Sequence, residues 1–344
     1  MITLHKPIAG PQYKSPEWYA LRKFDAHRTD RPVIFGASEA AAACNQSPYS
    51  SALEMYLEKR GEFVKEFTPG QQHIMDMGTR LEPIILDVYQ ERQECRLTRG
   101  LPVYFHPEWR FMAATPDAIA TKQIGGEEED VAEWCVDAKS TNWRMLDRSG
   151  DDSAKYGEEG TDQIPLGNLF QAQQQMAVMG MDLCEFPVLV DGRELRIYTV
   201  ARNDDLIKQI ALAEAELSER IISGDPPEPN FEHTGTLKVL QQMFGHEVGK
   251  VADLSEEEHD LWIRKEQLSS QEKMISEELD EIKARLLWAL GEAEIGRFQD
   301  ATIELKRTLI KDSYVTEKDV AALAARVGGV SRKGHCRLSA RKIG

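Results

Sequence analysis

The chain has 344 residues, of which 41% are hydrophobic and 29% charged, enough apolar material for one large soluble domain or two smaller ones. No apolar run approaches the roughly 20 residues of a membrane-spanning helix, and the N-terminus lacks the apolar segment of a secretion signal, so we expect a cytoplasmic protein without a membrane partner. The five cysteines include no Cys-x-x-Cys pair, which argues against a disulfide framework or a zinc site.

The charge of the chain is strongly negative and unevenly distributed. Its 42 basic and 58 acidic residues give a net charge of −16, whereas proteins that bind nucleic acid usually present a basic surface. Basic residues nevertheless collect in the tail formed by residues 326–344. The composition therefore lowers the expectation of nucleic-acid binding without excluding a local positive surface.

The N-terminal part of the chain is predicted to be helical. Ser15 and the proline that follows it start a short helix, in which Trp18 is expected to pack into the core. Ser38 has the chemistry and position of an N-cap for the Ala-rich helix that follows it. Residues 51–61 show the apolar spacing of an amphipathic helix.

A further helix is predicted over residues 77–92, and its start determines where Glu82 lies. Proline is best tolerated in the first turn of a helix, because it lacks the N–H that later turns require. Pro83 therefore places Glu82 at or near the N-terminus of this helix.

Residues 101–141 change to the alternating pattern of β-strands. Two of the expected strands carry an aspartate inside an apolar run, Asp117 in "TPDAI" and Asp137 in "VDAKST". Lys139 follows Asp137 at the spacing that places both side chains on the same face of a strand. Strands that only filled a core would carry apolar residues at these positions.

Helix and strand alternate again after these strands. Residues 168–180 are predicted to form a helix in which Gln173 is exposed, and residues 184–201 a hairpin around an Asp-Gly turn. A long helix then ends at Gly224. The proline-rich segment that follows places the domain boundary between residues 232 and 233.

The second predicted domain, residues 233–344, differs in character from the first, residues 1–232. Residues 255–290 are highly charged and carry leucine and isoleucine at mostly helical spacings. This pattern predicts one long helix whose apolar stripe suits internal packing or a coiled coil. A short β-hairpin and the basic tail follow.

An Asp-x-Lys tripeptide is by itself a weak signal, because a solvated ion pair at a strand edge gives the same pattern. Asp117 and Glu82 strengthen it, since three carboxylates and one lysine on converging elements form an oxygen-rich site suited to Mg²⁺, with Mn²⁺ as a substitute. A divalent cation there would polarise a phosphoryl oxygen. Lys139 would orient the attacking water, act as a general base if its pKa is lowered, or stabilise charge on the phosphate. Such a site is suited to hydrolysing a phosphodiester.

The order of these motifs resembles a known family. "TPDAI" followed by "VDAKST" is similar to the signature of PD-(D/E)XK nucleases. The segments "WYALR", "GASEAAAACNQSPYSS", "MGTRLEP" and "NLFQAQQQMAVMG" resemble the YqaJ-like viral recombinases, which are relatives of the phage lambda alkaline exonuclease. The resemblance implies a restriction-endonuclease-like core of the α/β (α+β) class, a central mixed β-sheet flanked by helices, with a C-terminal extension of a long helix and a small β-hairpin.

The resemblance implies a role for each residue of the expected metal site. Asp117 and Asp137 match metal-binding acids of the family, and Lys139 matches its catalytic lysine. Glu82 matches a helical glutamate beside the metal. Gly100 stands where a further acid of the exonuclease site would lie, so the sequence leaves open whether one or two metal ions bind.

The resemblance also implies a phosphate site. Arg22 and Ser38 match residues that hold a terminal 5′ phosphate, for which a guanidinium and a hydroxyl are suitable donors. Gln171 matches the helical glutamine that reaches the active site. Gln175, one turn further along, shares its face and is expected to contact phosphate or DNA.

The leading interpretation is a Mg²⁺-dependent deoxyribonuclease that degrades linear double-stranded DNA from 5′ to 3′ in phage-type recombination, because a clamp for a terminal phosphate favours a chain end. An endonuclease or a single-strand nuclease of the same fold, and a DNA-binding or scaffold protein with a decayed site, are the alternatives. Arg332 and Lys333 in the basic tail are expected to contact DNA. The resemblance suggests a homo-oligomer, and the long helix suggests a site for a single-strand annealing protein.

Overall fold

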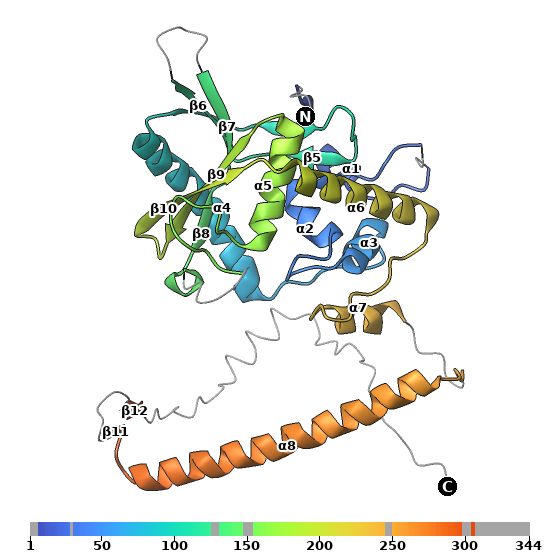
Figure 1. The fold of residues 1–344 in the computed structure, drawn as a ribbon, viewed down its shortest axis with the longest axis vertical. Coiled ribbons are helices and arrows are strands. Elements are labelled where there is room, and N and C mark those ends of the chain that lie inside the picture. The colour runs from blue at the N-terminus through green and yellow to red at the C-terminus, as the bar shows by residue number, and fades with distance from the viewer. Residues whose placement is uncertain are drawn as a thin grey trace, which may run out of the picture. The chain divides into compact units, whose positions relative to one another are not determined.

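The chain folds into two units, Met1–Gly245 and His246–Gly344 (Figure 1). The computed structural model describes residues 6–27, 30–124, 131–146, 154–244, 250–297 and 304–306. The division falls later than the boundary expected from the proline-rich segment, because α7 (Thr236–Met243) buries Val239 in the same apolar cluster as Leu53 and Leu217. In the part of the chain that the structure describes, no helix is long and apolar enough to cross a membrane.

The first unit contains two β-sheets. The four-stranded sheet has the order β1-β4-β5-β2, with β1 at Ile8–Gln12, β4 at Pro102–Phe105, β5 at Met112–Ala114 and β2 at Phe35–Gly36. The larger sheet has the order β10-β9-β7-β6-β3, and β8 also pairs with β9. Its strands are β3 (Arg96–Arg99), β6 (Ala118–Gln123), β7 (Val131–Val136), β8 (Lys139–Thr141), β9 (Leu183–Val190) and β10 (Glu194–Ala201). Because β7 pairs with β9 in parallel and with β6 antiparallel, the sheet is mixed, as the expected fold class requires.

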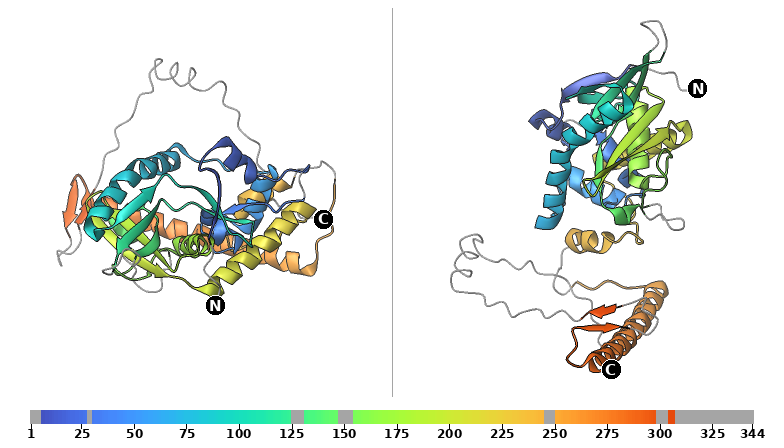
Figure 2. Two further views of the ribbon diagram at one scale, coloured as in Figure 1. Left: turned by 90° about the horizontal axis from the view of Figure 1, so that it is seen from above. Right: turned by 90° about the vertical axis from the view of Figure 1, so that its left-hand side faces the viewer.

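Helices cover both faces of the larger sheet (Figures 1 and 2). On one face, α5 (Leu166–Met179) packs through Ala172 and Met176 on residues that include Cys135 of β7. On the other face, α4 (Pro69–Gln93) packs through Leu86 and Tyr89 on a cluster that includes the next residue of β7, Val136. The alternation of side chains along β7 therefore builds two separate cores. The mixed α/β fold expected from the sequence is confirmed.

The strands expected between residues 101 and 141 are interrupted at both aspartates. Asp117 lies in a bend between β5, in the smaller sheet, and β6, in the larger. Asp137 and Ala138 lie between β7 and β8. The Asp137 N–H still donates to the carbonyl of Glu185 on β9 at 3.0 Å, so this break remains attached to the sheet. The acids therefore lie where strands end rather than inside one continuous strand.

The helix that carries Glu82 begins earlier than expected. Thr68 caps α4, because its hydroxyl accepts the N–H of Gln71 at 3.3 Å and the Gln71 side chain accepts the N–H of Thr68 at 2.9 Å. Pro83 is consequently in the helix interior, where it leaves the carbonyl of Thr79 without its usual N–H partner. The prediction that Glu82 lies near a helix N-terminus was wrong, because the capping signal at Thr68 sets the start.

Two further expectations near the N-terminus had different outcomes. The short helix α1 (Pro16–Leu21) begins after Ser15, whose hydroxyl accepts the N–H of Trp18 at 3.2 Å, and Trp18 is buried as predicted. Ser38 was expected to cap a helix, but it lies inside the 3-10 helix Ala37–Glu39, which runs directly into α2 (Ala40–Ala43). The side chain of Glu39 instead accepts the N–H of Gly36 at 2.8 Å.

The remaining helices of the first unit agree with the sequence in position. α3 spans Ala52–Arg60, and α6 spans Asp204–Ser223 and follows the hairpin formed by β9 and β10. Gln173 of α5 was expected to be exposed but is buried. Its side-chain amide donates to the carbonyl of Ala201 at 2.8 Å and accepts the N–H of Asn203 at 2.7 Å, which holds the side chain inside the protein. This side chain fastens the connection between β10 and α6.

The described part of the second unit contains one long helix and a small hairpin. α8 spans Glu256–Leu290, and β11 (Ile295–Arg297) pairs antiparallel with β12 (Glu304–Lys306). Both elements were predicted from the sequence. The apolar stripe of α8, which includes Leu261, Leu268 and Ile275, is exposed. The basic tail, with Arg332 and Lys333, lies outside the described residues.

Candidate active site

Asp117, Asp137 and Lys139 come together at the breaks that follow β5 and β7. The Asp117 carboxylate accepts the N–H of Ala138 at 2.8 Å, so it reaches the backbone between the other two residues. Lys139 forms an ion pair with Asp137. We call these three residues the carboxylate cluster. It holds two acids and one base, which leaves one carboxylate without a matching cation inside the cluster.

Two glutamines of α5 hold Asp137 in place. Gln171 and Gln175 both donate to its Oδ1, at 2.9 Å and 2.8 Å respectively. The side-chain amide oxygen of Gln171 also accepts a hydrogen bond from the Lys139 ammonium at 3.4 Å. Asp137 and Lys139 therefore both face α5, as their spacing predicts. The glutamines lie four residues apart, so one helix face supplies both bonds.

Gln175, which is expected to contact phosphate or DNA, lines the same cavity as Asp117 and Asp137, but its amide makes contacts inside the protein. Its side chain is fully buried, and the side-chain amide oxygen accepts a hydrogen bond from the Cys184 thiol at 3.4 Å. With both ends of the amide engaged inside the protein, Gln175 positions Asp137. Gln171 is less buried and bonds both to Asp137 and to Lys139.

The electrostatics of the carboxylate cluster favour binding of a cation. Burial and the charge of Asp137 raise the pKa of Asp117 well above its usual value. Burial alone would lower the pKa of Lys139, but the carboxylates of Asp137 and Asp117 outweigh it and raise that pKa. Lys139 is therefore a charged ammonium, which suits stabilising negative charge better than accepting a proton.

Glu82 lies near this cluster but does not join it. Burial raises the pKa of Glu82, Lys14 partly offsets this effect, and the charge of Asp137 adds to it. The cavity that Asp117 and Asp137 line does not include Glu82. Across the described residues, no three side chains from His, Cys, Asp and Glu are arranged to hold a metal ion. Of the three expected ligands, Asp117 and Asp137 line one cavity and Glu82 does not.

The pair of Asp117 and Asp137 nevertheless fits a hard divalent cation. Mg²⁺ is commonly bound by one or two carboxylates together with water and substrate phosphate. Burial and the charge of Asp137 raise the pKa of Asp117, and a bound cation would relieve this unfavourable ionisation. A metal at this position would be held by these two residues.

The same cavity contains the residues expected to hold a phosphate. It measures about 240 Å³, and Arg22, Ser38 and Gln171 line it together with both aspartates and Lys139. Ser38 is exposed. The structure thus brings the two groups of predicted residues to one cavity, although they are more than 70 positions apart in sequence.

Arg22 is held by a second charged group, which we call the guanidinium cluster: Arg22, Glu39 and Lys59. Glu39 pairs with Arg22 at 2.8 Å and with the buried Lys59 at 3.1 Å. The guanidinium also lies over the ring of Trp18, 5.4 Å from its centre. Burial would raise the pKa of Glu39, but Lys59 and Arg22 lower it to about 2. Glu39 is therefore ionised and fixes the position of Arg22.

Sequence reasoning missed three residues of this region. Glu39 and Lys59 look like ordinary helix-surface residues in sequence, and only their burial identifies them. Tyr13 also lines the cavity, and burial followed by the charge of Asp117 raises its pKa. It lies in the turn after β1, and no motif surrounds it. Gly100, where a further acid would lie, adopts φ +69° in a turn between β3 and β4.

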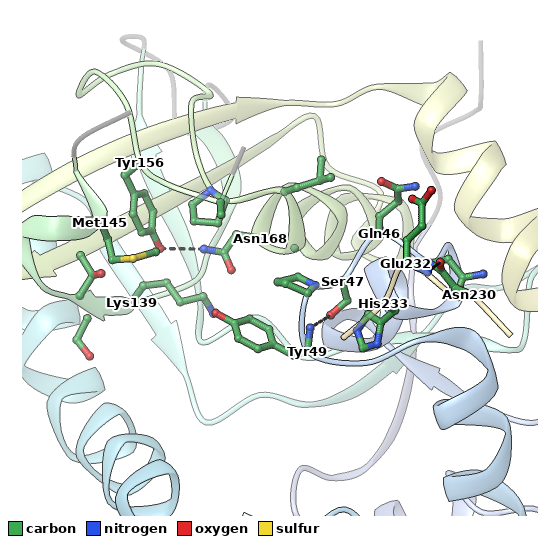
Figure 3. A pocket seen from close by; sticks show the side chains of 18 residues that line it. Gln46, Ser47, Tyr49, Lys139, Met145, Tyr156, Asn168, Asn230, Glu232 and His233 are labelled. Carbon is green, nitrogen blue, oxygen red and sulfur yellow. Dashed lines mark hydrogen bonds between the residues drawn. The ribbon is translucent and has the colours of Figure 1, made fainter. Parts of the chain in front are cut away.

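A second, larger cavity lies beside the first. It measures about 630 Å³, and Lys139 lines both cavities. Side chains from the loop after α2, from β8 and from the start of α5 line it, with Asn230, Glu232 and His233 from the segment after α6 (Figure 3). The two aspartates and Arg22 are not among the residues that line it.

The model of one protein family matches the part of the chain that contains most residues of the site. Residues 17–182 match the model of the YqaJ-like viral recombinase domain, so the resemblance expected from the sequence is confirmed. A Bacillus subtilis (strain 168) protein, uncharacterized protein YqaJ, is 23% identical over 261 residues, which cover 74% of this chain and 75% of that protein.

Two solved structures are also similar to the chain. An alkaline exonuclease (LHK-Exo) from Laribacter hongkongensis is 20% identical with a TM-score of 0.42, covering 61% of this chain and 94% of that chain. A phage related exonuclease from Haemophilus somnus 129PT is 12% identical with a TM-score of 0.40, covering 56% of this chain and 97% of that chain.

Proposed function

We propose that this chain, which carries a YqaJ-like viral recombinase domain over residues 17–182, is a metal-dependent DNA nuclease that degrades linear duplex DNA from a 5′ end. The observation that supports this most is the single cavity lined by Asp117, Asp137, Lys139 and Arg22. It combines a cation site with an anion site, as the hydrolysis of a phosphodiester near a terminal phosphate requires.

In this proposal, each residue has a distinct task. Asp117 and Asp137 hold Mg²⁺ or Mn²⁺, which when bound polarises the scissile phosphate and lowers the pKa of an attacking water. Lys139 stabilises the negative charge that develops on the phosphate, consistent with its raised pKa. Gln171 and Gln175 keep Asp137 in one orientation through their hydrogen bonds to its Oδ1.

The second group of donors supports degradation from a 5′ end. Arg22 and Ser38 would bind a terminal 5′ phosphate at one side of the cavity while the next phosphate of that strand lies at the aspartates. Such an arrangement releases one nucleotide at a time. A phosphate at the chain end then strengthens binding, which favours an exonuclease over an endonuclease.

Linear duplex DNA with a label in the base of one 5′-terminal nucleotide tests the proposal. In Mg²⁺ or Mn²⁺ we expect the label to be released as a mononucleotide, faster from 5′-phosphoryl than from 5′-hydroxyl ends, and no release in excess EDTA. Internal fragments that form at the same rate from duplexes with 5′-phosphoryl and with 5′-hydroxyl ends would indicate an endonuclease. No cleavage of duplex or single-stranded DNA in either metal would contradict the proposal and favour a DNA-binding protein without catalysis.

A further inference from the structure

The larger cavity is where a DNA strand would continue beyond the carboxylate cluster. If a terminal phosphate lies at Arg22 and the next phosphate at Asp117 and Asp137, the strand continues past Lys139, which is shared by both cavities. The larger cavity, of about 630 Å³, falls within the roughly 300–1,000 Å³ of pockets that hold small ligands. It therefore has room for a nucleoside.

The lining of this cavity is poor in positive charge and rich in amides. Its polar side chains include Asn45, Gln46, Ser47, Asn168 and Asn230. Lys139 is the one Lys or Arg among the described residues that line it, and in the proposed function its charge acts on the scissile phosphate at the carboxylate cluster. Glu232 adds a negative charge. Such a lining disfavours a phosphate and suits the donors and acceptors on the edge of a nucleobase.

Hydrogen bonds fix two of these amides in complementary orientations. The Asn45 oxygen accepts the N–H of Ala52 at 2.9 Å, which leaves its NH₂ group as a donor. The Asn168 NH₂ group donates to the hydroxyl of Tyr156 at 2.8 Å, which leaves its oxygen as an acceptor (Figure 3). Preorganised donors and acceptors lose little entropy when a ligand binds.

Tyr49 supplies an exposed aromatic ring at the same cavity. The side chain is 79% exposed, so its ring is accessible to a ligand. Its backbone is held on both sides, because its N–H donates to the Ser47 hydroxyl at 3.1 Å and its carbonyl accepts from Lys65 at 2.6 Å. Lys65 is itself paired with Glu54 at 2.9 Å. The ring is thus exposed on a loop that is firmly attached to the protein.

We propose that this cavity binds the nucleobase on the 3′ side of the scissile phosphate. The ring of Tyr49 stacks on that base, and Asn45 and Asn168 contact its edge. The proposal rests on the proposed nuclease function and deepens it, because it makes the rate depend on a base as well as on phosphates. Stacking tolerates every base, so this site detects the presence of a base more than its identity.

An abasic nucleotide tests the proposal without altering the protein. The substrate is linear duplex with a 5′ phosphate and a tetrahydrofuran abasic unit at the first, second or eighth nucleotide, and release of the first nucleotide is measured in a single turnover. We expect the unit at the second nucleotide to slow release by about tenfold, as loss of one stacked base would. Units at the other two positions should have a smaller effect.

Variants of Tyr49 complete the test. Tyr49→Ala should slow release from intact DNA by a similar factor and should lose the response to the abasic unit, whereas Tyr49→Phe should retain both. Phe244→Ala, which removes an exposed ring that lines neither cavity, is the control. The salt dependence of binding should be unchanged in Tyr49→Ala, because no phosphate contact is lost.

The possible results separate this proposal from the nuclease function. If the wild type releases nucleotides normally and the abasic unit has no effect, or slows the wild type and Tyr49→Ala equally, the base site is wrong and the nuclease function stands. If the wild type releases nothing in Mg²⁺ or Mn²⁺, the nuclease function itself fails. A thermal unfolding midpoint like that of wild type shows that the Tyr49→Ala variant is folded.

Discussion

The carboxylate cluster and the guanidinium cluster occupy one region of the molecule but carry opposite excess charge. The first combines two acids with one ammonium, and the second combines two cations with one carboxylate. The pKa of Asp117 is raised in the first, whereas the pKa of Glu39 is lowered to about 2 in the second. The carboxylate cluster therefore has an excess of negative charge, and the guanidinium cluster has an excess of positive charge. The two clusters can therefore bind a metal cation and a substrate phosphate side by side.

The largest effect should come from removing the charge of the carboxylate cluster. We expect Asp137→Asn and Lys139→Ala each to reduce hydrolysis of labelled duplex by about 10³-fold, since each removes a group that acts on the reacting phosphate. DNA affinity, measured in Ca²⁺ or EDTA, should change little. Asp87→Asn and Lys208→Ala alter exposed surface charges and serve as controls. Wild-type rates in either active-site variant would exclude this cluster as the catalytic centre.

The next effect is on the pH dependence of stability, through Glu39. Its folded pKa is about 2 and its unfolded value is near 4.5. Because the folded pKa is the lower one, the stabilisation is complete above about pH 5 and is lost as the pH falls toward 2. The loss is about 3 kcal/mol for a shift of this size, as an order of magnitude.

Urea unfolding between pH 6 and pH 3 measures this contribution. Glu39→Gln should be less stable than wild type at pH 6, and the difference should shrink as the pH is lowered. A constant difference across the range would mean that the Glu39 carboxylate is not strongly stabilised by Arg22 and Lys59. The same variant should also weaken the preference for 5′-phosphoryl ends, because it loosens Arg22.

A smaller effect is expected for the anion site itself. Arg22→Ala should slow release from 5′-phosphoryl ends by about 10–100-fold, the range of a lost charge-assisted hydrogen bond, and should leave 5′-hydroxyl ends almost unchanged. Arg99→Ala breaks a surface ion pair with Asp87 and is the matched control. If Arg22→Ala slowed both kinds of end equally, its role would be structural, and the guanidinium cluster would not be a phosphate site.

The smallest effect concerns metal binding to the carboxylate cluster. Mn²⁺ or Mg²⁺ at about ten times its Kd should raise the free energy of unfolding by about 1.4 kcal/mol. Asp117→Asn should be more stable than wild type in EDTA, because it removes a repelled carboxylate, and should lose the increment from metal. If Asp117→Asn kept the full increment, the cation would be bound elsewhere.

Several elements could be predicted from the sequence because their signals are local. Ser15-Pro16 starts α1, Gly61 ends α3, and the apolar spacing of residues 255–290 gives α8. The start of α4 was missed because Pro83 is a stronger local signal than the Thr68 cap, although packing keeps the proline inside the helix. Ser38 was misplaced for a similar reason, since Glu39 supplies the cap instead.

By itself, the sequence determined the residue types of the site and their order along the chain: Arg22, then Asp117, Asp137, Lys139 and Gln171. It also determined the resemblance to a family. Charge balance was decided by the tertiary structure, because burial and neighbours from distant segments set it. Only the fold shows that Lys59 and Glu39 hold Arg22, that Gln175 is occupied with Asp137, and that Glu82 does not line the cavity of the two aspartates. These contacts join residues far apart in sequence, and no local pattern records them.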